Sequence, residues 1–268
     1  MNDIQIVMLA SGSKGNAALI SSSRQRFLVD IGISCRELTK RMKEISVCPE
    51  ELDGVFITHE HIDHIRGLET FLKKYQVPVY SSTNTWRAIL GRYSTMERKN
   101  CRLIDGGLLC GDMRVESFAI PHDAADPHGY TFTSQASGAK CSYLTDAGFI
   151  TDTIREAVAG SDALVLEANH DVEMLKNGPY PQALKQRILS TRGHLSNNTA
   201  GMFLSMLERL PEHVVLAHLS EKNNLPRLAH DTVENILDEK KRLQETQLFV
   251  ADQHKVVADS PLVLDLGF

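Results

Sequence analysis

The stretch Val55-Phe56-Ile57-Thr58-His59-Glu60-His61-Ile62-Asp63-His64 places three histidines and one aspartate within six positions, directly after a short apolar run. The apolar residues 55–57 predict a buried strand and residues 67–72 predict the start of a helix, so the polar residues lie on a strand-to-helix turn. A lone histidine is more often structural than a ligand. Four candidate ligands on one turn indicate a metal site, because imidazole nitrogens suit zinc and similar ions and a carboxylate lets a second ion share the cluster.

The composition of the 268-residue chain indicates a globular protein without a strong net charge. Its 29 basic and 34 acidic residues give a formal charge of −5, so any polyanion must be bound locally rather than through a global field. The five cysteines are scattered without a C-x-x-C pair, which favours reduced thiols. We find no signal-peptide pattern and no apolar run of membrane-spanning length. We therefore expect a cytoplasmic protein that does not bind membranes.

Strand and helix patterns alternate along the chain. Expected strands cover residues 4–9, 17–22, 26–31, 55–57, 77–80, 102–104, 112–120, 130–134, 140–145, 163–167, 214–219 and 247–251. Expected helices cover residues 34–45, 68–74, 83–92, 151–159, 180–190, 199–210 and 226–243. Because we see no repeat, low-complexity tract or linker, we expect one domain over residues 1–268, an α/β sandwich of two β-rich halves flanked by helices.

Further histidines and acids follow expected strands in the same manner. Asp146 ends the strand at 141–145, His218 lies in the strand at 214–219, and the strand at 115–120 is followed by two histidines, His122 and His128. Two divalent ions held about 3.5–4 Å apart need a shared anionic ligand to offset their repulsion. Asp146 has the chemistry for that bridging role.

Taken together, these motifs resemble those of the metallo-β-lactamase superfamily of hydrolases, in the same order along nearly the whole chain. Asp30 in Phe27-Leu28-Val29-Asp30-Ile31-Gly32 matches the first motif, and His59 to His64 match the second. The resemblance implies a four-layered αβ/βα sandwich with two divalent ions, zinc, manganese or iron. It implies one metal held by His59, His61 and His122, a second held by Asp63, His64 and His218, Asp146 as the bridge, and Asp30 as a residue that fixes the ligand loop through hydrogen bonds.

The choice of His122 over His128 rests on the phosphodiesterase members of this superfamily. In those members the third-motif histidine directly follows a strand and precedes a Gly-aromatic pair, and Gly129-Tyr130 supplies that pair here. We therefore expect His122 to be the ligand. His128 would be a substrate-side or plain loop residue.

A second informative string is Gly193-His194-Leu195-Ser196-Asn197-Asn198-Thr199-Ala200, just before an expected helix that Ser196 or Asn197 could cap. A helix N-terminus favours phosphate, but a capping loop with an incidental histidine explains the string equally well. With Leu216-Ala217-His218-Leu219-Ser220, the string resembles the paired motifs of tRNase Z and related phosphodiesterases. That resemblance implies a catalytic His194 supported by Glu167, which ends the strand at 163–167.

The glycine-rich turn Leu9-Ala10-Ser11-Gly12-Ser13-Lys14-Gly15-Asn16-Ala17 is weak by itself, since such turns are common between strands. Together with the string after His194 it resembles the YycJ (WalJ) group, which implies a dinuclear nuclease that degrades DNA from the 5′ end. A metal-bound hydroxide would attack phosphorus, and Asp63 could orient this nucleophile while it binds metal. Candidate phosphate contacts are Ser11, Asn16 and Ser196. We identify no protein partner.

Other basic residues are candidate substrate contacts, namely Lys14, Arg66, Arg87, Arg92, Arg98 and Lys99, the last four in a stretch that also carries Trp86 and Tyr93. A solvated helix face explains this stretch slightly better than a DNA-binding patch. Two other functions stay open. One is a phosphodiesterase for small or cyclic nucleotides, which the net acidity suits, and the other is a metal-bearing regulatory protein with a vestigial core.

Overall fold

The computed structural model describes residues 4–257, which form two β-sheets packed face to face. The first sheet has the order β1-β2-β3-β4-β5-β6, antiparallel from β1 to β3 and parallel from β3 onward. The second has the order β13-β12-β11-β10-β9-β8-β7, antiparallel from β7 to β10 and parallel from β10 to β13. The strands are β1 (Gln5–Ala10), β2 (Ala17–Ser21), β3 (Arg26–Val29), β4 (Gly54–Phe56), β5 (Val79–Ser81), β6 (Cys101–Leu103), β7 (Gly107–Cys110), β8 (Met113–Ala119), β9 (His128–Ser134), β10 (Lys140–Leu144), β11 (Ala163–Glu167), β12 (His213–Ala217) and β13 (Gln247–Val250).

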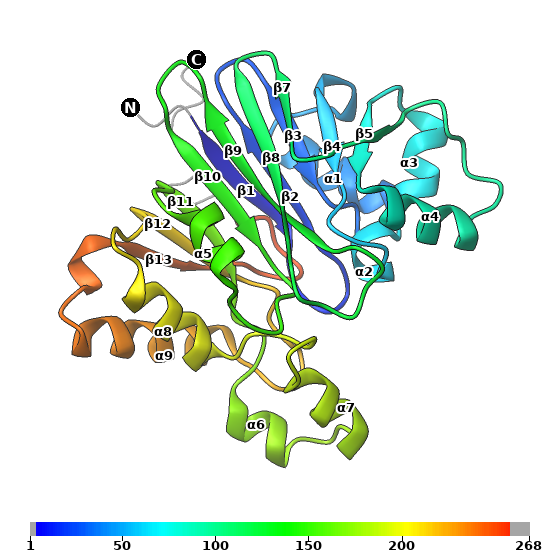
Figure 1. Ribbon diagram of the computed structural model, residues 1–268. Coiled ribbons are helices and arrows are strands. Elements are labelled where there is room, and N and C mark those ends of the chain that lie inside the picture. The colour runs from blue at the N-terminus through cyan, green and yellow to red at the C-terminus, as the bar shows by residue number, and fades with distance from the viewer. Residues whose placement is uncertain (1–3, 258–268) are drawn as a thin grey trace.

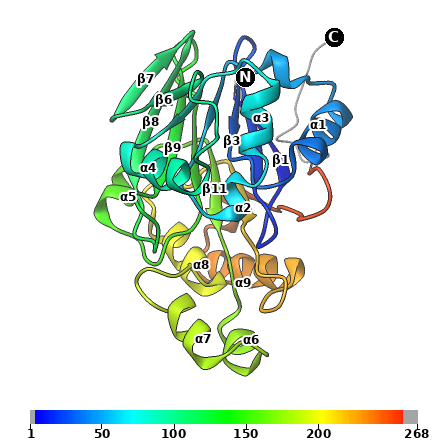
Figure 2. The ribbon, with the colours of Figure 1, turned by 90° about the vertical axis from the view of Figure 1, so that its right-hand side faces the viewer.

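Helices cover the outer face of each sheet (Figure 1). They are α1 (Cys35–Glu44), α2 (Ile62–Ile65), α3 (Leu68–Lys74), α4 (Thr83–Arg92), α5 (Asp152–Val158), α6 (Val172–Asn177), α7 (Gln182–Ile188), α8 (Asn197–Met206) and α9 (Pro226–Glu239), with single 3₁₀ turns η1 (Pro49–Glu51) and η2 (Leu243–Glu245). Helices α1 and α3 lie on the first sheet, and α5, α8 and α9 lie on the second (Figures 1 and 2). None of the helices between residues 4 and 257 is both long enough and apolar enough to cross a bilayer.

Three apolar clusters hold these layers together. Between the sheets, the rings of Phe27 and Phe132 stack with centroids 6.0 Å apart, and Phe56 packs on Tyr130 at 5.3 Å. A second cluster joins the first sheet to its helices, and a third joins the second sheet to its helices. Apolar burial is the main favourable term in folding, so each sheet is stabilised on both faces. The expected four-layered sandwich is confirmed.

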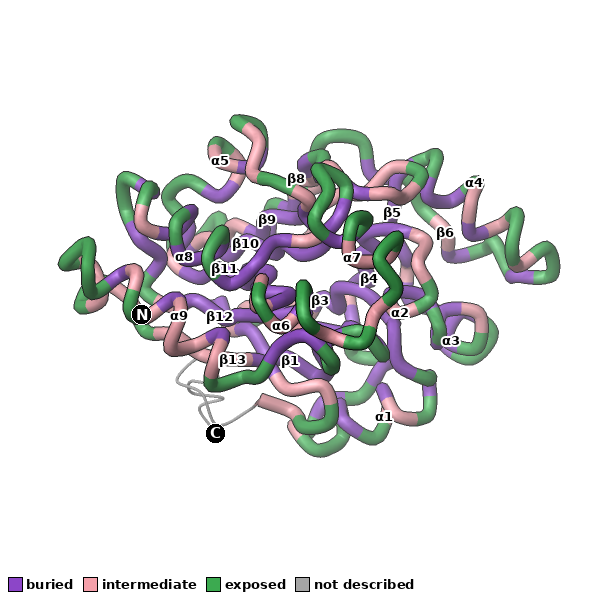
Figure 3. The backbone as a smooth tube through the Cα atoms, turned by 90° about the horizontal axis from the view of Figure 1, so that it is seen from below, coloured by how far each residue is buried: buried purple, intermediate pink, exposed green. Residues whose placement is uncertain are grey.

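Apart from the two 3₁₀ turns, the sequence analysis missed three short elements. Strand β7 alternates between exposed and half-buried residues, and its hairpin with β8 turns at Gly111, whose φ of 59° lies in the left-handed region. Helix α2 spans only four residues among the ligands, and α6 spans six residues capped by the side chain of Asp171. Elements this short carry little periodicity to detect. Helices α6 and α7 nevertheless matter, because they lie across the end of the sandwich (Figure 3).

Candidate metal centre

The site lies where parallel strands end. Asp30 follows β3, Asp146 follows β10 and His218 follows β12, each within two residues of the strand end. All three have positive φ values, 63°, 61° and 57°. Such angles are uncommon outside glycine and cost free energy, and they cluster at functional sites where the chain must turn a side chain sharply. Here they direct three polar side chains to one edge of the two sheets.

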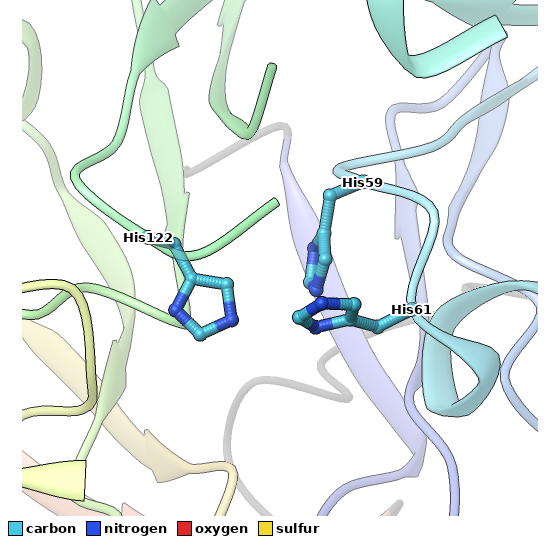
Figure 4. A group of neighbouring side chains, drawn as sticks. All are labelled: His59, His61 and His122. Carbon is cyan, nitrogen blue, oxygen red and sulfur yellow. The ribbon is translucent and has the colours of Figure 1, made fainter. Parts of the chain in front are cut away.

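His59, His61 and His122 form the first group of candidate ligands. One ring nitrogen from each lies within 4.8 Å of the others, and Figure 4 shows the three imidazoles pointing toward one another. His122 donates from Nδ1 to the Gly193 carbonyl at 3.1 Å, which leaves its Nε2 for the group. The Nε2 atoms of His59 and His122 are buried, and neither has a hydrogen-bond partner in the described chain. Because unpaired buried nitrogens are costly, their arrangement fits a metal ion.

Asp63, His64 and His218 form a second group. An Asp63 oxygen lies 3.6 Å from His64 Nε2 and 3.5 Å from His218 Nε2. Asp146 stands between the groups, with Oδ2 3.3 Å from His64 Nε2 and Oδ1 3.7 Å from His122 Nε2. Its Oδ2 also lacks a hydrogen-bond partner in the described chain. The structure thus brings together all seven residues expected to bind metal, and two nearby divalent ions fit this donor set.

Asp30 orients His64, a member of the second group, by bonding the ring nitrogen that faces away from the group. Its fully buried carboxylate accepts from His64 Nδ1 at 2.7 Å and from the Thr58 amide at 2.8 Å. Because His64 donates from Nδ1, its Nε2 is left to face Asp63 and Asp146. This is the hydrogen-bonding role expected for Asp30, since a carboxylate on the far nitrogen fixes the tautomer of a ligating histidine. Thr58 was missed by the sequence analysis, although it directly precedes His59.

Glu167 connects His194 to the metal centre. Its Oε1 accepts from His194 Nδ1 at 2.8 Å and from His218 Nδ1 at 2.9 Å. Its Oε2 accepts from the amides of Ala147 at 2.9 Å and Leu195 at 3.0 Å. The expected pairing with His194 is therefore present in the structure. The contact with His218 was not expected, and it makes one buried carboxylate the support of both histidines.

The other residues expected near phosphate have protein partners. Ser11 Oγ accepts from the His218 amide at 2.7 Å, and the Asn16 side chain lies 3.3 Å from His64 Nε2 while it also bonds Gly12. Both are buried and hold the ligand loops. Of the two predicted caps, Ser196 is the N-cap of α8, with its hydroxyl accepting from the Thr199 amide at 3.1 Å, and Asn197 is the first residue of the helix. Contact of these three residues with phosphate stays a prediction.

Burial and neighbouring charges shift the pKa values of the histidines in the centre. Burial lowers the pKa of His59 and of His122. Burial opposes protonation of His64 as well, but the carboxylates around it, Asp146 foremost, raise its pKa to about 9. His218 behaves in the same way: burial lowers its pKa, but Asp146, Asp63 and Glu167 together outweigh burial and raise it. A histidine must be deprotonated to bind metal, so metal ions compete with protons at His64 and His218.

A cavity of about 220 Å³ opens on the centre. The residues that line it are Ser13, His61, Asp63, His122, Asp146, Asn169, Tyr180, Leu184, Arg187, Ile188, Gly193, His194, His218 and Ser220. His194 is partly exposed there, which leaves it accessible to a ligand. Tyr180, Leu184 and Arg187 were not singled out by the sequence analysis, and no motif marks them.

The basic stretch formed by α4 and the residues that follow it to Lys99 does not line this cavity. Trp86 is buried at 5% exposure, and its Nε1 donates to the Arg102 carbonyl at 2.8 Å. Because it is buried, Trp86 cannot stack on a base, so its place in a DNA-binding patch is wrong. Contact of the exposed basic residues Arg87, Arg92, Arg98 and Lys99 with DNA stays a prediction. His128 is not a loop residue but begins β9, where its amide donates to Thr58 and its ring to Asp126. It does not line the cavity either.

Residues 25–219 match the family model for the beta-lactamase superfamily domain, and the chain therefore belongs to this superfamily of metallo-hydrolases. It is 38% identical to exodeoxyribonuclease YycJ of Bacillus anthracis over 237 residues, which cover 87% of this chain and 89% of the relative. It is also 38% identical to exodeoxyribonuclease WalJ of Streptococcus pneumoniae over 260 residues, covering 95% of this chain and 93% of that protein. The resemblance to the YycJ/WalJ group is confirmed.

Solved structures agree on the fold. The metallo-beta-lactamase fold protein YhfI of Bacillus subtilis superposes with a TM-score of 0.69 at 18% identity, over 95% of this chain and 99% of YhfI. The short form of human tRNase Z gives a TM-score of 0.63 at 19% identity, over 94% of this chain and 98% of that chain. At these identities the likeness extends to the architecture alone.

Proposed function

We propose that this chain is a metal-dependent phosphodiesterase, and specifically a 5′-to-3′ DNA exonuclease. The observation that carries the proposal is His194, which lines the cavity beside the candidate metal centre and is hydrogen-bonded at 2.8 Å to the buried Glu167. The similarity to two proteins named exodeoxyribonucleases, over most of each chain, supports DNA as the substrate. The formal net charge of −5 fits an enzyme that binds the end of a strand rather than a long duplex.

We propose that the centre holds two divalent ions, either zinc or manganese, with iron a further candidate. When bound, they would activate a water molecule and neutralise the oxygens of the phosphate. Asp63 lies on the cavity side of the second group, where its carboxylate could accept a proton from the attacking water and orient it. We also propose a cytoplasmic location, which the five free thiols support because the cytoplasm is reducing. We propose further that residues 1–268 form one domain.

His194 supplies the proton for the leaving group in this proposal. Its Nδ1 is occupied by Glu167, so Nε2 is the nitrogen left to meet the leaving oxygen in the cavity. Glu167 holds the ring in place through this bond while its second oxygen is fixed by two backbone amides. Positioning a proton donor in this way commonly contributes about 10²–10⁴-fold to a rate.

The test measures metal content of the purified protein and its cleavage of DNA labelled at the 5′ or the 3′ end. We expect about two ions per chain, release of mononucleotides from the 5′ end, and loss of activity on chelation that returns with zinc or manganese. Cyclic nucleotides serve as the competing substrate. Faster turnover of cyclic nucleotides than of DNA ends, or cleavage from the 3′ end only, would contradict the proposal.

A further inference from the structure

One wall of the cavity comes from the segment that carries α6 and α7. Tyr180, Leu184, Arg187 and Ile188 line the cavity from this side. In Figures 1 and 2, α6 and α7 lie beyond the ends of the strands that carry the candidate ligands, so a molecule that reaches the metal centre passes beside them. None of these four residues belongs to the metal centre itself.

Arg187 brings a positive charge to this wall. Among the cavity-lining residues of the described chain it is the only lysine or arginine. Its Nε donates to Asp123, whose other oxygen lies 3.4 Å from His122 Nε2. No group in the described chain bonds the two terminal nitrogens of the guanidinium, and the side chain is 53% exposed. A guanidinium whose Nε is hydrogen-bonded and whose terminal N–H groups have no partner is suited to bind a phosphate.

The position of Arg187 is fixed relative to His194. The Ile188 carbonyl, at the end of α7, accepts from the His194 amide at 3.0 Å. The intervening Gly193 allows this approach, because a Cβ at that position would lie 2.0 Å from the Ile188 carbonyl oxygen and 2.4 Å from that of Arg187. The end of α7 and the proposed proton donor are therefore parts of one tightly packed unit.

Tyr180 lies in the linker between α6 and α7 and presents an aromatic side chain, half-buried, to the same cavity. Nucleobases stack on such rings with little dependence on sequence. We propose that residues 172–188 form a nucleotide-binding wall, in which Arg187 contacts a backbone phosphate next to the scissile one and Tyr180 stacks on a base. This inference rests on the proposed nuclease function and assigns the residues that hold its substrate.

The test is binding of a single-stranded oligonucleotide, with fluorescein at its 3′ end, to the metal-loaded His194→Ala protein at several salt concentrations. Adding Arg187→Ala should weaken binding about tenfold or more, since a hydrogen bond to a charged group is lost. It should also reduce the slope of log Kd against log salt by about 0.7, the value for one phosphate contact on a single strand. Arg187→Lys should keep the slope.

Two further variants separate charge and stacking from general damage to the segment. Lys185 lies on the same helix, and its side chain donates to the Lys176 carbonyl outside the cavity. Lys185→Ala therefore removes a cation from α7 and should leave the salt slope unchanged. Tyr180→Ala should weaken binding about fivefold or more without changing the slope, whereas Tyr180→Phe should bind normally.

An unchanged slope in Arg187→Ala, or an equal loss in Lys185→Ala, would overturn the assignment of Arg187. Normal binding by Tyr180→Ala would overturn that of Tyr180. The parent protein's cleavage of DNA ends is measured in parallel. If the parent cleaves ends but the Arg187 and Tyr180 variants bind the oligonucleotide as tightly as the His194→Ala protein alone, only the wall is refuted. If the parent does not cleave DNA ends and the His194→Ala protein does not bind the oligonucleotide, the proposed function is refuted.

Discussion

Replacing Glu167 by glutamine tests how much of the centre depends on one buried carboxylate. Its four hydrogen bonds pair Oε1 with two imidazoles and Oε2 with two backbone amides, at 2.8 to 3.0 Å. All four partners are donors. A glutamine has only one acceptor oxygen, so in either orientation its NH₂ group faces two donors in a site with no exposure to water.

The expected cost follows from that geometry. Leaving a buried donor unpaired costs about 1–3 kcal/mol, so two such donors predict a loss of about 2–6 kcal/mol in the free energy of unfolding. If the NH₂ group meets the imidazoles, His194 and the candidate ligand His218 both lose their support. Loss of a carboxylate behind a metal ligand commonly costs about 10–100-fold in metal affinity or activity. We therefore expect Glu167→Gln to impair both metal binding and turnover.

Denaturant unfolding of the chelated protein measures stability, and metal titration and DNA cleavage measure function. Glu37→Gln is the matched control, because Glu37 forms an ion pair with Arg41 at 2.8 Å but is 37% exposed. Its change in stability should stay below about 1 kcal/mol. A Glu167→Gln protein with the stability, metal affinity and turnover of the parent would refute the reasoning.

Three other substitutions test the ligand assignments. Asp146→Ala should bind at most one metal ion per chain and lose activity, since it removes the anion between the two groups; a variant with two ions and normal turnover would contradict this. His122→Ala should lose metal on elemental analysis whereas His128→Ala should not, and the opposite pattern would exchange their roles. Asp30→Asn should weaken metal binding about 10–100-fold through His64, and an unchanged titration curve would remove Asp30 from this role.

The sequence predicted the parts of the centre that are local. His59, His61, Asp63 and His64 are contiguous, so their convergence requires only that the turn after β4 place them together. Most strand and helix positions were also predictable, because buried strands read as apolar runs and helices as amphipathic stripes. Asp146 could be anticipated at a strand end for the same reason, whereas Glu167 was expected only from the resemblance to tRNase Z and related phosphodiesterases.

Other features depend on packing between distant segments. The bond from Glu167 to His218 joins residues 51 positions apart, and no motif records it. Arg187 lines the cavity from α7, which packs closely against the chain at Gly193. Trp86 turns toward the core although Arg87 and Arg92 lie in the same stretch. Side-chain direction and cavity shape arise from the assembled layers, so these features became visible only in the structure.

The most direct test of the proposed mechanism is His194→Ala. The geometry leaves two possible roles for His194, because it lies in the cavity beside the candidate centre and also belongs to a group with Asp146, Glu167 and His218 that could hold a metal. We predict that His194→Ala keeps the metal content of the parent and cleaves DNA ends about 10²–10⁴-fold more slowly. Cleavage at the parent's rate with both metals bound would contradict the proton-donor role, and loss of a metal ion would make His194 a ligand instead.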